Sequence, residues 1–158
     1  MDPLTALDKA KNLFLESLDH PEYRTLRVVI HETSQSHTLW RYEGPVPKEP
    51  VEPAYVSGRW EIMFSKFVSY SIQDEFYKPP DDSEQWSGNR LRFYSKSKFH
   101  DYVKSFTMGR HEAYGGTAHF CLVMEDYVID VVATTRPQVR SLDPYAPATK
   151  RWSISEVR

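Results

Sequence analysis

A predicted β-hairpin over residues 117–134 carries three side chains with the chemistry of a catalytic site. The segment is the most apolar in the chain, and its two predicted strands are joined by a turn at residues 125–126. If that turn has two residues, Cys121 pairs with Asp130, and His119 lies diagonal to Asp130 on the same face. A shift of one residue would turn Asp130 to the opposite face. The spacing therefore predicts a His119–Asp130 pair beside Cys121 in the two-residue register.

Such a group is suited to nucleophilic catalysis, in which a histidine activates a thiol or hydroxyl and an acid orients the histidine. The hairpin resembles papain-like and transglutaminase-like folds, where a histidine on one strand and an Asp or Asn on the next serve a nucleophile at a helix N-terminus. The resemblance is confined to this hairpin and implies those roles for His119 and Asp130. The cysteine departs from the pattern, because Cys121 lies within a strand, whereas the preceding helix N-terminus carries Ser95 and Ser97. Under this interpretation the nucleophile is Cys121, Ser95 or Ser97.

The same residues also have a structural interpretation. A cysteine among Phe, Leu and Val usually packs as a small apolar side chain. A histidine and an aspartate on neighbouring strands often satisfy each other or the backbone. Asp130 is the least expected residue of the hairpin, because it lies between Ile129 and Val131 and an unpaired buried carboxylate is costly. Asp130 must therefore face solvent, a partner or a site.

Charge is segregated along the chain, although the net charge of the whole sequence is only −2. Residues 74–84 hold five acids against one lysine, and residues 88–110 hold six bases against Asp101. An acidic loop favours a basic partner, and a basic segment with aromatic side chains between its charges favours RNA or an acidic protein. The competing interpretation is a solvated surface with these aromatic side chains in the core. The near-zero total gives no overall attraction to nucleic acid or anionic lipid, so we expect a protein partner and neither a nucleic acid nor a membrane. The residues predicted to bind it are Asp74, Glu75, Asp81, Asp82, Glu84 and Trp86.

No motif indicates a metal, a phosphate or a cofactor. The His-Glu pair at residues 31–32 and the histidine at 37 lack the spacing of a metalloprotease helix. With residues 111–112 and His119 they would form a metal site only if the fold brought three or four ligands together. The glycine pair at 115–116 lacks the Lys-Ser/Thr of a phosphate loop. We therefore predict no metal and no cofactor.

The order of the predicted elements favours an α+β fold. Apolar residues at helical spacing predict helices over residues 3–18 and 97–106, the second capped by Ser95 or Ser97. In the strand predicted over 59–77 the alternation slips at Ser65–Phe67, which indicates a bulge or a turn that makes two strands. The other strands are predicted over 24–32, 37–43, 90–94 and on both sides of the hairpin turn. Because strands and helices do not alternate, we expect one antiparallel sheet of about five to seven strands with both helices packed on one face.

The length of 158 residues predicts a single domain over residues 1–158. Four prolines make residues 44–58 an extended surface connection, residues 78–89 read as a loop, and residues 138–158 form an extended C-terminal tail with a short extended piece at 152–155. A single cysteine, the absence of a signal-peptide pattern and the absence of a long apolar run predict a cytoplasmic protein.

Two classes of function are consistent with these features. The segregated charge, the high aromatic content of 14% and the incomplete catalytic set favour a small cytoplasmic protein-binding module, by analogy of size and composition an inhibitor or immunity-type protein. The alternative is a cysteine or serine hydrolase or acyl transferase that uses His119 and Asp130. The enzyme requires His119 to hydrogen-bond Asp130 at an open pocket beside a helix N-terminus.

Overall fold

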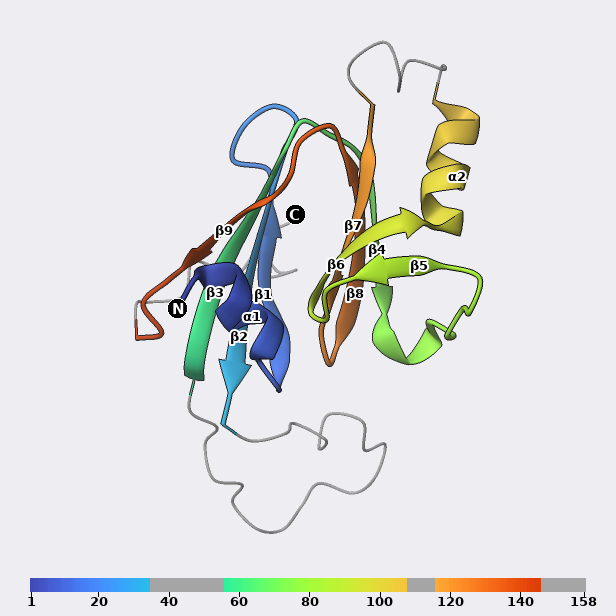
Figure 1. The fold of residues 1–158 in the computed structure, drawn as a ribbon. Coiled ribbons are helices and arrows are strands. Elements are labelled where there is room, and N and C mark those ends of the chain that lie inside the picture. Colours follow the sequence, from blue (N-terminus) through green and yellow to red (C-terminus); the bar gives the residue numbers. More distant parts are fainter. Residues whose placement is uncertain (35–55, 108–115, 146–158) are drawn as a thin grey trace, which may run out of the picture.

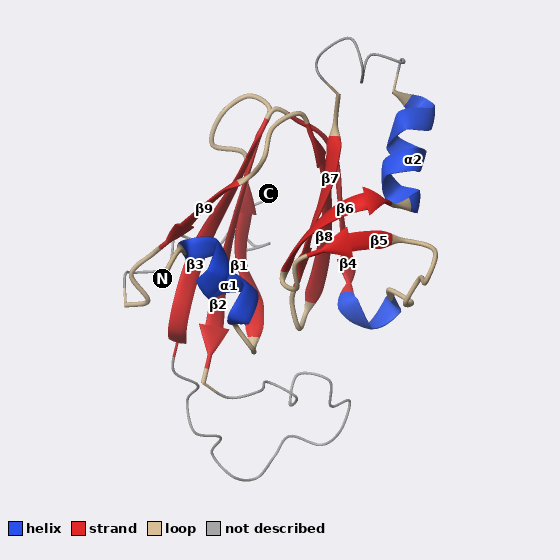
Figure 2. Cartoon of the chain, in the orientation of Figure 1, coloured by secondary structure: helices blue, strands red, loops and turns tan. Residues whose placement is uncertain are grey.

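The computed structural model describes residues 1–34, 56–107 and 116–145, which form two antiparallel sheets and two α-helices (Figures 1 and 2). Sheet A has the strand order β1-β2-β3-β9, and sheet B has the order β4-β8-β7-β6-β5. The fold is thus α+β, but two sheets replace the single sheet that the sequence predicts. The strands of sheet A are β1 (Leu13–Asp19), β2 (Thr25–Thr33), β3 (Val56–Ser65) and β9 (Gln138–Ser141). Those of sheet B are β4 (Phe67–Asp74), β5 (Gln85–Ser87), β6 (Leu91–Lys96), β7 (Ala118–Val123) and β8 (Tyr127–Ala133).

Lys66 marks the point at which the chain passes from sheet A to sheet B. The strand predicted over residues 59–77 is divided there into β3 and β4, and Lys66 adopts a left-handed backbone with a φ of 54°. The backbone N–H of Thr134 donates to the Lys66 carbonyl at 3.3 Å, which ties the turn to the end of β8. The predicted slip at 65–67 is therefore a turn. The prediction of one sheet was wrong because alternation along a strand does not show which sheet the strand joins.

The N-terminal segment differs most from its prediction. Helix α1 spans only Pro3–Lys9, and residues 13–19 pair with β2 as a strand. A bulge between Leu15 and Ser17 shifts the alternation of β1, so that Leu13 lies in the core and the partly buried Leu15 and Leu18 both pack against it. Their spacing across the bulge imitates the spacing of a helix face. The prediction of a helix over residues 3–18 was wrong for this reason.

The two sheets face each other across one core. Phe64 of sheet A and Phe120 of sheet B are both buried, and their rings lie 6.1 Å apart. Since side chains alternate along a strand, His119 on β7 points to the outer face of sheet B. Helix α2 (Lys98–Phe106) covers that outer face, where the Phe99 ring lies 5.3 Å from the His119 ring (Figure 1).

The two helices do not share one face of a sheet, contrary to the prediction. Helix α1 contacts β9 of sheet A and β6 of sheet B, whereas α2 contacts β7 and β8. Within the described ranges, neither helix has the length and apolar character needed to cross a membrane.

Three segments that the sequence predicts as loop, connection or tail contain strand residues in the structure. The predicted loop 78–89 includes β5, which pairs with β6. The predicted tail 138–158 begins with β9, which pairs with β3. Strand β3 begins at Val56, within the predicted connection 44–58. The predicted strand 37–43, residues 44–55 and the piece predicted around residues 152–155 lie outside the described residues.

Candidate functional site

The β7–β8 hairpin has the register of a two-residue turn. Cys121 pairs with Asp130 and His119 pairs with Val132. His119 and Asp130 thus share the outer face of sheet B, and His119 Nε2 lies 2.8 Å from Asp130 Oδ1. The exposed fractions of the two residues are only 1% and 6%. The predicted pairing of His119 with Asp130 is confirmed.

Ser97 extends this pair to a chain of three hydrogen-bonded side chains. Ser97 is the N-cap of α2, where its Oγ accepts the backbone N–H of His100 at 3.1 Å. The same Oγ lies 2.7 Å from His119 Nδ1. Ser95, by contrast, lies exposed near the end of β6, and its hydroxyl donates to the carbonyl of Gln85. Of the three predicted nucleophiles, Ser97 is the one that is hydrogen-bonded to His119.

The positions of the protons in this chain follow from the donors and acceptors. Burial alone would raise the pKa of Asp130, but the hydrogen bond from His119 and the positive charge of Lys78 outweigh burial and lower it. An ionised carboxylate can only accept, so His119 donates through Nε2. In a singly protonated imidazole Nδ1 is then the acceptor, and the Ser97 hydroxyl donates to it. For a singly protonated His119, the hydrogen-bond network therefore assigns the tautomer with the proton on Nε2.

Lys78 is a member of the site that the sequence did not identify. Its Nζ lies 3.1 Å and 3.0 Å from the two carboxylate oxygens of Asp130, and 4.0 Å from Cys121 Sγ. Burial would lower the pKa of Lys78, but the acidic groups of Cys121 and Asp130 outweigh burial and raise it. The ammonium thus balances the buried carboxylate. The signal available in the sequence was that Lys78 is the only base among the acids of residues 74–84.

Two aromatic rings hold the imidazole. Tyr94 on β6 stacks on His119, with ring centroids 4.4 Å apart and planes inclined by 18°. Phe99 on α2 packs against the same imidazole. Because the rings restrict rotation of His119, they keep Nδ1 directed to the helix and Nε2 directed to β8.

Cys121 has the properties of a core residue. Its exposed fraction is 0%, and burial together with the charge of Asp130 raises the pKa of its thiol. The thiolate is the nucleophilic form of cysteine. These properties favour the structural interpretation of Cys121 over a role as nucleophile.

A pocket of about 530 Å³ opens over the His119–Asp130 pair. Its walls come from β4, from the segment after β4 and from the first turn of α2. The lining residues are Ser71, Gln73, Lys78, Pro79, Pro80, Asp81, Asp82, Glu84, Lys98, Phe99, His119 and Asp130.

Residues 81–84 of the acidic loop contact the N-terminus of α2 and line this pocket. Asp81 Oδ2 lies 2.6 Å from Lys98 Nζ, and Glu84 Oε2 accepts the backbone N–H of Lys98 at 2.9 Å. Asp82 lines the same pocket. The structure thus brings three of the residues predicted to bind a partner to the pocket of the predicted catalytic pair.

The other residues predicted to bind a partner are not among those that line the pocket. Asp74 caps the short helix η2 (Glu75–Tyr77) by accepting the backbone N–H of Phe76 at 2.9 Å. Trp86 on β5 is partly exposed, and the guanidinium of Arg92 lies 4.6 Å from its ring centroid.

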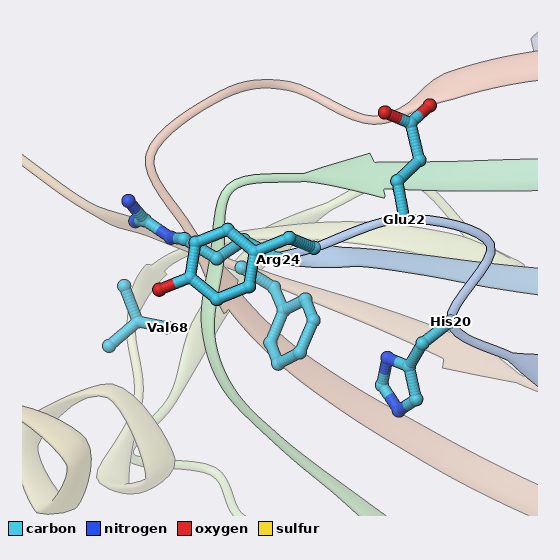
Figure 3. A pocket seen from close by; sticks show the side chains of 6 residues that line it. His20, Glu22, Arg24 and Val68 are labelled. Carbon is cyan, nitrogen blue, oxygen red and sulfur yellow. The ribbon is translucent and has the colours of Figure 1, made fainter.

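A second pocket, of about 560 Å³, lies beside the turn between β1 and β2 (Figure 3). His20 in its wall is already hydrogen-bonded, to the Tyr70 hydroxyl at 3.0 Å and to the Thr25 carbonyl at 3.2 Å. The Glu22 carboxylate points away from the His20 imidazole (Figure 3). Because polar groups do not converge there, the pocket over His119 is the stronger candidate.

The described residues contain no group of three or more His, Cys, Asp or Glu side chains that could hold a metal ion. His31 and Glu32 lie in β2, remote in the fold from the outer face of sheet B that carries His119. Residues 37 and 111–112 lie outside the described ranges.

Comparison of the chain with protein-family models, with curated proteins and with solved structures finds no match. The function is therefore argued from the geometry of the site.

Proposed function

We propose that the protein is a serine hydrolase or acyl transferase in which Ser97 is the nucleophile, His119 the general base and Asp130 the acid that orients His119. The supporting observation is the hydrogen-bonded chain, with 2.7 Å from Ser97 Oγ to His119 Nδ1 and 2.8 Å from His119 Nε2 to Asp130 Oδ1. A nucleophile, a base and an orienting acid in contact are the groups that acyl transfer requires.

In the proposed reaction Ser97 Oγ attacks the carbonyl carbon of an ester, thioester or amide, and its proton passes to His119 Nδ1. Asp130 stabilises the resulting imidazolium through the hydrogen bond from Nε2. His119 then gives the proton to the leaving group, and the acyl group remains on Ser97. In the second half of the reaction, water or an acceptor alcohol or amine attacks the acyl carbon and gives its proton to His119. The bond from the acyl carbon to Ser97 Oγ then breaks, and His119 returns the proton to Oγ, which restores the hydroxyl.

The first turn of α2 is the proposed source of oxyanion stabilisation. The backbone N–H of Lys98 donates to a carboxylate oxygen of Glu84. In the proposed reaction the oxyanion of the substrate would take the place of this Glu84 oxygen and accept the same N–H. Ser97 is only 4% exposed. The reaction therefore requires Glu84 to leave this N–H and the Asp81–Lys98 ion pair to open.

Hydrolysis of p-nitrophenyl esters and of matching thioesters tests the proposal. We expect the wild-type protein to exceed the uncatalysed rate and Ser97→Ala to lower kcat by a factor of about 10³ or more. Ser95→Ala is the matched control, because Ser95 lies outside the hydrogen-bonded chain, and it should retain the wild-type rate. Equal rates for Ser97→Ala and the wild type would exclude Ser97 as the nucleophile.

The second candidate is the protein-binding module of the inhibitor or immunity type, and a different surface supports it. Phe76 and Tyr77 on η2 are each 73% exposed and follow directly on Asp74 and Glu75. Exposed aromatic residues beside charges are typical of protein interfaces.

A pull-down from native lysate tests this second candidate. A partner bound by the wild type should be lost when Phe76 and Tyr77 are both changed to alanine, or when the charges of Asp81, Asp82 and Glu84 are reversed. Asp101→Lys is the control, since Asp101 is exposed on α2 and does not line the pocket. An unchanged set of partners in all variants would contradict the binding function.

A further inference from the structure

Lys78 lies outside the chain of Ser97, His119 and Asp130, yet it reaches the acid of that chain from the pocket side. Its ammonium contacts both oxygens of Asp130, and Asp130 Oδ1 accepts from His119 Nε2 as well. We propose that Lys78 is a positioning residue, whose ammonium clamps the Asp130 carboxylate so that Oδ1 receives the N–H of His119 and Nδ1 is left to face Ser97. This inference rests on the proposed function.

The clamp is needed because the backbone fixes the position of the Asp130 Cβ but not the rotation of its carboxylate. Asp130 is 6% exposed, so Lys78 occupies most of the space from which water in the pocket would donate to its oxygens. A contact to both oxygens restricts rotation of the carboxylate, whereas the single bond from His119 leaves this rotation free. Lys78 therefore fixes the plane of the carboxylate, and with it the direction in which an oxygen faces His119.

The charges around Asp130 make Lys78 the main electrostatic partner. His119 and Cys121 face it from β7, and Ser71 lies opposite it on β4. Tyr94 from β6 and Phe99 from α2 pack on His119. The other charged residues that line the pocket are Asp81, Asp82, Glu84 and Lys98, and Arg92 on β6 lies beside Cys121 on the same face of sheet B. Of the described residues that contact Asp130, Lys78 is the one whose side chain is a permanent cation at neutral pH.

The pocket also offers a matched control. Lys98 lines the same pocket and forms an ion pair with Asp81. Its side chain is 76% exposed, whereas that of Lys78 is 24% exposed. The change of each lysine to methionine removes the same charge from the same pocket, but only Lys78→Met removes the contact with Asp130.

Nuclear magnetic resonance of the full chain, labelled with ¹⁵N-histidine and ¹³C-aspartate, tests the inference without a substrate. In the wild type we expect the His119 ring nitrogens to report the tautomer with the proton on Nε2. In Lys78→Met, Asp130 should take up a proton at a pH about one unit or more higher than in the wild type. The single tautomer should be lost as the pH falls through that value. Lys78→Arg, which keeps the positive charge, should retain the wild-type titration of Asp130 and the wild-type tautomer of His119. Lys98→Met should also leave both at their wild-type values.

The ester assay supplies the second measurement. Lys78→Met should lower kcat about tenfold with a smaller change in KM, because a misplaced base impairs the chemical step more than substrate binding. Unchanged titration of Asp130 and an unchanged His119 tautomer in folded Lys78→Met would overturn the role of Lys78, and so would an equal change of this titration and tautomer in Lys98→Met. Absence of esterase activity in the wild type would contradict the proposed function, while the resonance experiment would still decide whether Lys78 positions Asp130.

Discussion

The hydroxyl of Ser97 is hydrogen-bonded to His119 Nδ1 at 2.7 Å, although the two residues are 22 positions apart in the sequence. The same hydroxyl oxygen accepts the backbone N–H of His100 in the first turn of α2. Ser97 therefore caps α2 and also connects this helix to His119 on the outer face of sheet B. Experiments on this residue have to separate its effect on stability from its effect on activity.

Substitution of Ser97 separates the two effects. Ser97→Ala should lower the free energy of unfolding by about 1 kcal/mol, the usual cost of a lost N-cap. Ser97→Asn keeps a capping side chain but lacks the hydroxyl, so we expect a stability closer to the wild type and no esterase activity. Urea unfolding and the ester assay measure the two quantities. Activity in Ser97→Asn would show that the hydroxyl is dispensable.

The free energy of unfolding should depend on pH through Asp130. The folded state lowers the pKa of Asp130, so the stabilisation is fully present above the unfolded pKa of about 4 and is lost as the pH falls through the folded pKa. Urea unfolding between pH 2 and 6 should show this loss in the wild type, and Asp130→Asn should reduce the slope. If the free energy of unfolding depended on pH equally in the two proteins, Asp130 would not be the source of this dependence.

At pH 7 the change Asp130→Asn should also destabilise the fold. It removes the anion that balances Lys78 and faces His119. We expect a loss of about 2 kcal/mol, less than for a fully buried pair because the Lys78 side chain is 24% exposed. Thermal or urea unfolding measures the loss, and Lys98→Met, which breaks an exposed pair, should cost less.

Cys121 should be unreactive in the native protein. Its burial and the raised pKa of its thiol predict that a maleimide reacts with Cys121 only after unfolding, and that Cys121→Ala retains esterase activity. Mass spectrometry of the labelled chain over time measures the reaction. Fast labelling under native conditions, together with an inactive Cys121→Ala, would restore Cys121 as the candidate nucleophile.

The turn between the sheets gives a test of the fold. Lys66 has a φ of 54°, which costs energy for a residue with a side chain and little for glycine. Lys66→Gly should therefore leave the free energy of unfolding unchanged or raise it by up to about 1 kcal/mol, whereas Lys66→Val should lower it. Urea unfolding of the two variants measures the difference. A large loss for Lys66→Gly would contradict a left-handed backbone at this position.

The local part of the site could be predicted from the sequence. The alternation of apolar residues and the short turn determine which face of the hairpin carries His119 and Asp130, and the N-cap preference of serine identified the start of α2. The contact between Ser97 and His119 could not be predicted, because it depends on how α2 packs on sheet B. Lys78 was missed for the same reason, since it reaches Asp130 from a distant segment of the chain.

The errors in the fold also arise from contacts between distant segments. The apolar residues of β1 fit a helix as well as a bulged strand, and pairing with β2 decides between the two. The slip at Ser65–Phe67 was visible, but only the pairing of β3 with β2 and β9, and of β4 with β8, shows that β3 and β4 belong to different sheets.

The most direct test of the proposed function is the identification of the residue modified by a fluorophosphonate ester, which reacts with activated serine hydroxyls. Intact-mass and peptide-mapping measurements should show a single adduct, located on Ser97. The adduct should be absent in Ser97→Ala, strongly slowed in His119→Asn and unchanged in Ser95→Ala. An unmodified Ser97, under conditions that fully label a known serine hydrolase, would contradict the proposal.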